Sequence, residues 1–295
     1  MHRRSELQTD RTLINKIVIV QSLSEGEMHT GTRLHEDLET LDVWHNRGLN
    51  PELRNIPSKD DLMNLLRDLK EEARLSAQWP VLHIEVHGNR DGIVLASGDF
   101  ISWQELKIPL IELNIATRNN LLVVLSACYG AYLTKTIIPT DRAPCWGLVG
   151  PHEEMSAGAL LSSFQEFYSE LFATGNGDQA LKRLNDAVRS ENLSYLFSQC
   201  ESFFKMVYKA YFRDYFSPKA LKLRAGELYK RAKEMGGTPK LSPGEIKRKL
   251  LQEKEPSFEK HCEQFFMYDL YQENRKRFRV TYQDILNLVA SKPLK

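Results

Sequence analysis

The chain has 295 residues, of which 42% are hydrophobic and 27% charged, and its formal net charge at pH 7 is +1. This composition is that of an ordinary globular protein. No apolar run approaches the roughly 18 residues that a membrane span needs, and the N-terminal residues lack the apolar segment of a secretory signal, so we expect a cytoplasmic protein with no membrane partner.

The first two thirds of the chain alternate between short apolar runs and amphipathic stretches. Apolar runs rich in β-branched residues indicate buried strands, while leucines at three- and four-residue spacing indicate helices, as in the segment 56–77 that Ser58 can cap. Apolar strands separated by helices predict an α/β fold with a mostly parallel sheet flanked by helices. In chain order, the sequence predicts a strand at 16–23, a helix at 30–41, a short strand around 42–45, a helix at 56–77, a strand at 81–86, a hairpin at 92–103, a helix at 103–113, strands at 121–126 and 145–151, and helices at 156–175 and 178–188.

Strand signals stop after about residue 192, and the remaining segments have the pattern of helices, including the stretch "LFSQCESFFKMVYKAYFRDYF". The charge changes at the same place. Residues 1–192 contain 19 Lys and Arg against 27 Asp and Glu, whereas residues 193–295 contain 21 against 12. We therefore predict two domains, an acidic α/β domain at 1–192 and a helical, basic regulatory or sensor domain at 193–295.

Basic and aromatic residues alternate at the start of this second domain. Such a combination can bind nucleotides, because bases stack on aromatic rings and phosphates attract Lys and Arg. The commoner alternative is an amphipathic helix whose aromatic residues face a core, and we rank it first. A sensor, or a brake on the acidic domain, comes second, and nonspecific nucleic-acid binding comes last. The candidate ligand-binding residues are Lys205, Tyr208, Lys209, Tyr211 and Arg213.

Two predicted strands end in residues that can take part in catalysis. The segment "VLHIEVHGN" ends in His87-Gly88, and "LLVVLSACYG" ends in Cys128. Functional residues of open parallel sheets gather beyond the carboxyl ends of the strands, so we expect both side chains at one edge. An imidazole near a thiol can activate it as a nucleophile. The backbone N–H groups of Gly88 and Cys128 could then form an oxyanion hole.

These segments resemble the caspase-like cysteine peptidases, in particular the CHAT branch. The resemblance lies in a strand ending in His-Gly, the hairpin "DGIVLASGDFISW", and a strand ending in Ser-Ala-Cys-x-Gly, and it covers about residues 15–190. It implies a caspase–haemoglobinase-like fold and peptide-bond hydrolysis, with His87 as general base and acid and Cys128 as nucleophile. It also implies a bacterial antiphage setting, with activation by a nucleotide second messenger or a sensor protein.

The sequence departs from this family at the position two residues before the nucleophile. Caspases have a glutamine there and metacaspases an acid, which helps to form the pocket for the substrate residue P1, whereas this chain has Ser126. Neither family's specificity therefore transfers. Residues after the next predicted strand are alternative selectors of P1: His152, Glu153 and Glu154. No aspartate-rich linker suited to maturation by cleavage is evident, which favours activation by a ligand or partner.

The other cysteines and histidines with reactive or metal-binding side chains have simpler interpretations. Cys145, Cys200 and Cys262 lie in no comparable context and are expected to be buried thiols. The wide spacing of all four cysteines gives little support to disulfides or a structural zinc site. His83, Glu85 and His87 alternate along one strand and share a face. We expect His83 and Glu85 to pair inside the sheet, and we predict no metal and no cofactor.

We expect a latent cysteine endopeptidase that acts on protein or peptide substrates. One alternative is a caspase-like scaffold with an idle dyad that acts as an adaptor through its C-terminal domain. Another is a Cys-His amidase or acyl transferase on a similar fold. The sequence leaves the substrate, the activator and the oligomeric state open.

Overall fold

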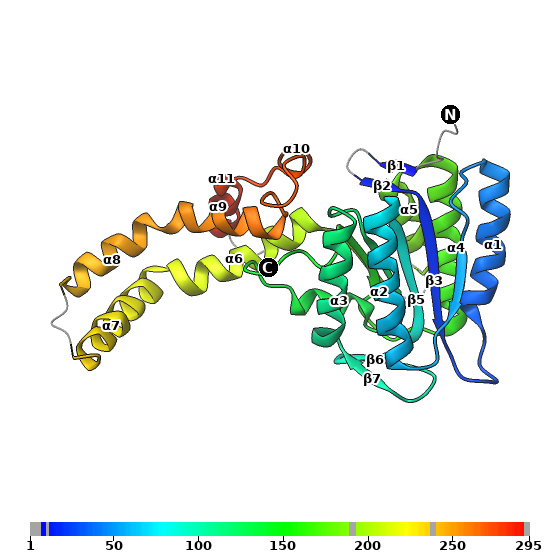
Figure 1. Cartoon of the computed structure of the whole chain (residues 1–295), viewed down its shortest axis with the longest axis horizontal. Helices are drawn as coiled ribbons and strands as arrows, with labels where there is room; N and C mark the ends of the chain where they lie inside the picture. The colour runs from blue at the N-terminus through cyan, green and yellow to red at the C-terminus, as the bar shows by residue number, and fades with distance from the viewer. Residues whose placement is uncertain (1–6, 10–11, 189–192, 237–239, 292–295) are drawn as a thin grey trace. The chain divides into compact units, whose positions relative to one another are not determined.

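The structure is a computed structural model that describes residues 7–9, 12–188, 193–236 and 240–291. Within these residues, no helix combines the length and the apolar character needed to cross a membrane. The chain divides into two compact units (Figure 1). The first consists of Met1–Thr136 and Ala143–Cys200, and the second of Ile137–Arg142 and Glu201–Lys295.

The first unit is built on a mixed sheet. Its main strands have the order β10-β9-β8-β5-β3-β4, in which the five strands from β9 to β4 run parallel and β10 runs antiparallel. The hairpin β6–β7 extends from the end of β5. The strands are β3 (Lys16–Ser22), β4 (Glu52–Asn55), β5 (Pro80–Gly88), β6 (Gly92–Val94), β7 (Phe100–Ser102), β8 (Leu122–Ser126), β9 (Gly147–Pro151) and β10 (Tyr195–Gln199), while β1 (Leu7–Thr9) and β2 (Thr12–Ile14) pair separately.

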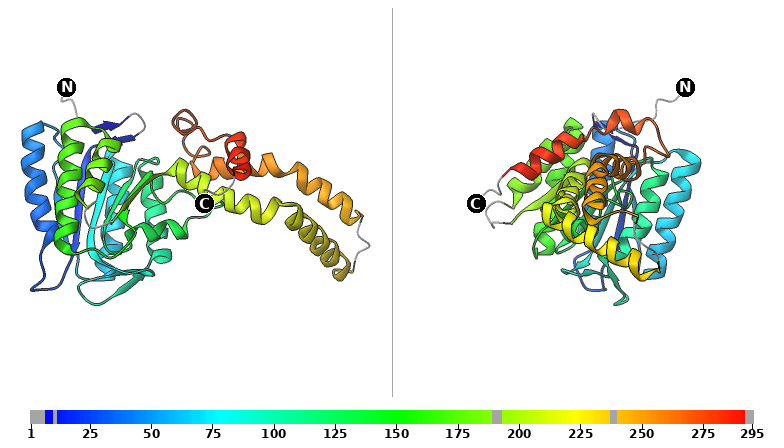
Figure 2. Two further views of the ribbon diagram at one scale, coloured as in Figure 1. Left: turned by 180° about the vertical axis from the view of Figure 1, so that it is seen from behind. Right: turned by 90° about the vertical axis from the view of Figure 1, so that its left-hand side faces the viewer.

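Helices cover both faces of this sheet. Figures 1 and 2 show α2 and α3 on one face and α1, α4 and α5 on the other. The Oγ of Ser58 accepts a hydrogen bond from Asp61 N–H and caps α2, as predicted. The buried residues of α2 follow helical spacing, so one face of the helix packs on the sheet. The elements are α1 (Thr30–His45), α2 (Lys59–Ser76), α3 (Trp103–Ala116), the 3₁₀ segment η1 (Gly130–Thr136), α4 (Ala157–Thr174) and α5 (Gly177–Ala187).

The predicted α/β class is confirmed, with a mostly parallel sheet between helices. Strands β3, β8 and β9 are buried along their whole length, which explains why their sequences are nearly continuous apolar runs. The prediction of a short strand around residues 42–45 was wrong, because α1 continues to His45, and strand β4 was not predicted. Its sequence, Glu-Leu-Arg-Asn, lies at the sheet edge with half-buried and exposed side chains, so it carries no apolar signal.

The prediction of helix for residues 196–199 was wrong. These residues belong to β10, which pairs with β9 from Tyr195 opposite Pro151 to Gln199 opposite Gly147. The helix begins only at Cys200, whose N–H donates to the carbonyl of Trp146. A five-residue edge strand that leads directly into an aromatic-rich helix has no turn residues to mark it. The first unit consequently ends at Cys200 and not at residue 192.

The second unit is helical in its described residues. Its core is a cluster of aromatic rings centred on Phe204, whose ring centroid lies 5.1 Å from those of Phe265 and Phe266. The guanidinium of Arg142 forms two hydrogen bonds with the Asp269 carboxylate, at 2.6 and 2.8 Å, and so ties the segment Ile137–Arg142 to this unit. The helices are α6 (Cys200–Phe216), α7 (Pro218–Glu234), α8 (Pro243–Gln252), α9 (Lys254–Phe265), α10 (Asn274–Arg277) and α11 (Tyr282–Ala290).

Candidate active site

The ends of β5 and β8 place His87 and Cys128 at the same edge of the sheet. Glu85 is paired in register with Ser126 on the neighbouring parallel strand. His87 lies in the last residues of β5, and Cys128 lies two residues beyond the end of β8. Both residues line a cavity of about 280 Å³ in the first unit. Its lining residues are Leu23, Glu27, Met28, Thr30, Glu85, Val86, His87, Ser126, Cys128, Met155, Ala157 and Leu160.

Gly88 allows the two strand ends to approach closely. A Cβ atom at this position would lie 2.3 Å from the carbonyl oxygen of Cys128 and 3.0 Å from the Cβ of Ala127. The backbone after β5 is thus packed against the backbone after β8. The N–H of Asn89 donates to the carbonyl of Gly92 in the hairpin, so in the antiparallel ladder the N–H of Gly88 points away from β6.

Cys128 lies in a tight turn beyond β8. The N–H of Gly130 donates to the carbonyl of Ala127, and Tyr129 has a φ of +60°, a left-handed conformation that is unfavourable for a tyrosine. The cysteine is half-buried. Its sulfur accepts a hydrogen bond from Met155 N–H at 3.4 Å and lies 3.6 Å from the Met155 carbonyl oxygen. Met155 thus holds the sulfur in place from the segment that precedes α4.

His87 is oriented by Glu27. The Nε2 atom of His87 lies 2.6 Å from Glu27 Oε1, and the two side chains are 60% and 35% exposed. Glu27 is itself fixed by a turn in which Ser24 N–H donates to its Oε2 and Gly26 has a φ of +90°. The Ser24 N–H lowers the pKa of Glu27 below its ordinary value against the opposing effect of burial, and the neighbouring His87 lowers it further. Glu27 thus engages one ring nitrogen of His87, Nε2, and holds the ring from the turn at 24–27.

A row of polar side chains crosses the sheet below these residues. Asn55, Gln21, Glu85 and Ser126 are register partners on the neighbouring strands β4, β3, β5 and β8. Gln21 Nε2 donates to Asn55 Oδ1 at 2.9 Å. Ser126 is buried, and its Oγ has no hydrogen-bond partner among the described residues. A buried hydroxyl without a partner is uncommon and points to a site that a ligand or water completes.

Glu85 belongs to a buried hydrogen-bond network. Its Oε1 lies 2.9 Å from His83 Nε2, and its Oε2 accepts from Thr30 Oγ1 at 2.8 Å. The predicted pairing of His83 with Glu85 is thus confirmed. His83 Nδ1 lies 3.1 Å from the hydroxyl of Tyr168 on α4. Burial, and then the charge of Glu85, raise the pKa of Tyr168 well above its ordinary value, so this hydroxyl keeps its proton and can donate it to Nδ1.

The proposed selectors after β9 do not line the cavity. His152, Glu153 and Glu154 are exposed. The Glu153 carbonyl accepts from Tyr129 N–H, and the Glu154 carboxylate lies 3.5 Å from the Tyr129 hydroxyl, so this loop supports the turn after Cys128. The residue that reaches the cavity is Met155, the next in the chain.

The candidate ligand-binding residues of α6 do not form an exposed stacking surface. Tyr208 is fully buried among the rings of Phe204, Phe258 and His261, where it cannot stack on a base. Burial raises its pKa, which is consistent with this position in the core. Lys205 lies 3.7 Å from Asp284. Tyr208 therefore fits the amphipathic alternative, while Lys209 and Tyr211 are half-buried and Arg213 is exposed.

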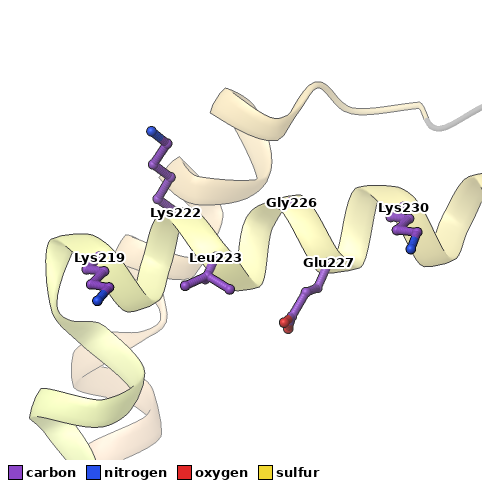
Figure 3. Close-up of a pocket in the computed structure, with 6 residues that line it drawn as sticks. All are labelled: Lys219, Lys222, Leu223, Gly226, Glu227 and Lys230. Carbon is purple, nitrogen blue, oxygen red and sulfur yellow. The ribbon is translucent and has the colours of Figure 1, made fainter.

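A second pocket lies along α7 in the other unit. Figure 3 shows its lining residues on one helix, with Lys222 and Glu227 on opposite sides. All its lining residues belong to α7, so its side chains do not converge on one point as those of the first unit's cavity do. We therefore take the cavity beside Cys128 as the candidate active site.

Comparison of the sequence with protein-family models and with curated proteins gave no match.

Several residues of the site were not predicted from the sequence. Glu27 lies 60 positions before His87, and Met155 lies 27 positions after Cys128. The segment "SEGE" at 24–27 carries a turn signal that could have drawn attention to Glu27. Thr30, at the start of α1, gave no signal, because its role depends on where α1 packs against β5.

Proposed function

We propose that the chain is a cysteine endopeptidase of the caspase-like type, with Cys128 as nucleophile and His87 as general base and acid. The observation that supports this most is the shared cavity. It brings together a half-buried thiol, an imidazole oriented by Glu27, and the close backbone approach of Gly88 to Cys128. The sheet order and the His-Gly and Ala-Cys strand ends are consistent with a caspase–haemoglobinase-like fold.

Peptide hydrolysis at this site would proceed in two steps. The thiolate of Cys128 attacks the scissile carbonyl carbon, and the backbone N–H groups of Gly88 and Cys128 stabilise the oxyanion. His87 transfers a proton to the leaving amine as the C–N bond breaks, which leaves an acyl group on the sulfur. Water, deprotonated by His87, then hydrolyses this thioester and restores the thiol.

The resting arrangement supports a latent enzyme. The sulfur of Cys128 is engaged with the backbone of Met155, and Nε2 of His87 with Glu27. The thiol proton must leave the Met155 carbonyl and reach His87 before attack can occur. We therefore include activation by a nucleotide signal or a protein partner in the proposal. This activation and the setting in bacterial defence rest on the family resemblance.

The test compares new protein termini by mass spectrometry after incubation in bacterial lysate, with and without small-molecule extract from phage-infected cells. We expect the wild type to generate termini that are absent with Cys128→Ala and with His87→Ala. His152→Ala is the matched control, because His152 is exposed and lies outside the cavity, and it should retain the wild-type termini.

Identical termini from the wild type and Cys128→Ala under all conditions would contradict the proposed nucleophile. A thiol probe then separates the alternatives. Labelling of Cys128 that does not require His87 is the result expected of an idle scaffold that acts as an adaptor. Turnover of small thioesters or amides without new protein termini would identify an amidase or acyl transferase instead.

A further inference from the structure

The inner end of the cavity differs chemically from its mouth. His87 and Glu27 are partly exposed and form the mouth with Cys128, whereas Glu85 and Ser126 are 2% and 1% exposed and lie inside. We propose that this cavity binds the side chain of an arginine or lysine in the substrate, next to the bond that Cys128 cuts. This inference rests on the proposed function and adds its substrate class.

The walls of the cavity suit the aliphatic part of such a side chain. The lining of the cavity also includes the apolar residues Leu23, Met28, Val86, Met155 and Leu160. Its volume of about 280 Å³ lies at the lower limit of the roughly 300–1,000 Å³ of small-molecule sites. It therefore fits one side chain better than an extended ligand. Long basic side chains bury their methylene groups along apolar surface and keep the charged end in a polar environment.

The acidic group at the inner end is the Glu85 carboxylate. His83 Nε2 lies 2.9 Å from its Oε1, and His83 Nδ1 lies 3.1 Å from the Tyr168 hydroxyl. The residues that line the described cavity include two glutamates, Glu27 and Glu85, but no lysine or arginine. A cationic side chain would be attracted to these carboxylates.

The hydrogen-bonding capacity of this end also calls for donors. A carboxylate offers about four acceptor sites, and His83 and Thr30 use one on each oxygen of Glu85. Ser126 Oγ, on the register partner of Glu85, has no partner among the described residues. A guanidinium has five N–H donors and an ammonium three. An acidic side chain would meet the charge of Glu85, and an apolar one would leave both polar groups unpaired.

The test uses four peptidyl acyloxymethyl ketones that differ only in the residue next to the reactive group: arginine, lysine, norleucine or glutamate. The rate at which each modifies Cys128 in the full-length protein is followed by intact mass. We expect the arginine and lysine probes to react at least roughly tenfold faster than norleucine, with glutamate slowest. Reaction with iodoacetamide, which carries no such side chain, reports the reactivity of the thiol alone.

Two variants assign this preference to the inner end. Glu85→Gln should reduce the ratio of arginine to norleucine rates to about threefold or less, with each rate taken relative to the iodoacetamide rate of the same variant. Ser126→Ala leaves the Glu85 carboxylate in place and should reduce the ratio of arginine to norleucine rates by a smaller factor. A melting curve for each variant confirms folding. Faster reaction of the norleucine probe in the wild type, or an unchanged ratio in folded Glu85→Gln, would overturn the proposal.

A binding measurement keeps the inference separate from catalysis. Ligand-observed NMR with agmatine, a small guanidinium compound, is carried out on the full-length Cys128→Ala protein. We expect binding that is lost on adding Glu85→Gln and kept on adding Glu153→Gln, because the Glu153 side chain is exposed and lies outside the cavity. Agmatine binding together with no Cys128-dependent proteolysis would refute the proposed function alone. Absence of agmatine binding would refute the substrate class.

Discussion

At the scale of single residues, the site depends on contacts between side chains that are far apart in the sequence. His87 and Cys128 lie at strand ends, but Glu27 and Met155 hold them from loops. Glu27 has the geometry of an orienting carboxylate, since its Oε1 lies 2.6 Å from Nε2 of His87. In a hydrolytic triad such a group holds the imidazole in the useful tautomer.

Glu27→Gln should therefore lower the rate of Cys128-dependent cleavage by roughly tenfold or more, because the amide cannot stabilise the imidazolium formed during attack. The effect should be smaller than for a buried triad aspartate, since Glu27 is 35% exposed. Cleavage is measured on the activated protein, with Glu25→Gln as the control from the same turn. Equal rates for the two variants would show that Glu27 does not orient His87.

At the scale of elements, several helices begin at residues with a clear local cause. Helix α3 starts with a capping box in which Ser102 Oγ accepts from Glu105 N–H and the Glu105 carboxylate accepts from Ser102 N–H. Lys59 also lies 3.0 Å from this carboxylate. These contacts, the Ser102 backbone first and then Lys59, lower the pKa of Glu105 from 4.5 to about 2.

Stability should accordingly depend on the charge of Glu105. Because its pKa is lower in the folded chain than in the unfolded chain, the stabilisation is present above pH 4.5 and is lost as the pH falls toward about 2. We expect Glu105→Gln to melt below the wild type at pH 7, with a difference that disappears near pH 2. Thermal melts at intervals between these pH values test this. A difference that stays constant down to pH 2 would contradict it.

Element boundaries were predicted where the local sequence decides them. The strand ends at His87 and at Ser126 follow from apolar runs that stop, and the cap of α2 follows from Ser58. Strands β4 and β10 were not predicted, because an edge strand needs no continuous apolar run and is held by its neighbour's backbone.

At the scale of the whole molecule, the chain forms two units whose segments are not contiguous. The first unit needs β10, which follows the proposed boundary at residue 192, and the second includes Ile137–Arg142 from between η1 and β9. Tyr195 of β10 is buried against the ring of Phe164 at 5.3 Å, and Phe197 lies 6.3 Å from Trp146. The edge strand therefore contributes apolar packing as well as hydrogen bonds.

A fragment of residues 1–200 should therefore be more stable than one of residues 1–192. Loss of β10 exposes the edge of β9 and removes the packing of two aromatic side chains, which together contribute about 2–4 kcal/mol to the free energy of unfolding. Urea unfolding of the two fragments measures this difference, and the shorter one should also aggregate more readily through its open strand edge. Equal unfolding midpoints would indicate that β10 adds nothing to the first unit.

The sequence by itself determined the α/β class, the main strands, and the positions of His87, Gly88 and Cys128 at strand ends. These features follow from local patterns, because a buried parallel strand needs a continuous apolar run and the chemistry lies where that run stops. Only the tertiary structure decided the polar row from Asn55 to Ser126, the orientation of His87 by Glu27, and the hydrogen-bond network that holds Glu85 at the cavity. Those features depend on the register between strands and on the approach of distant loops, which no short stretch of sequence records.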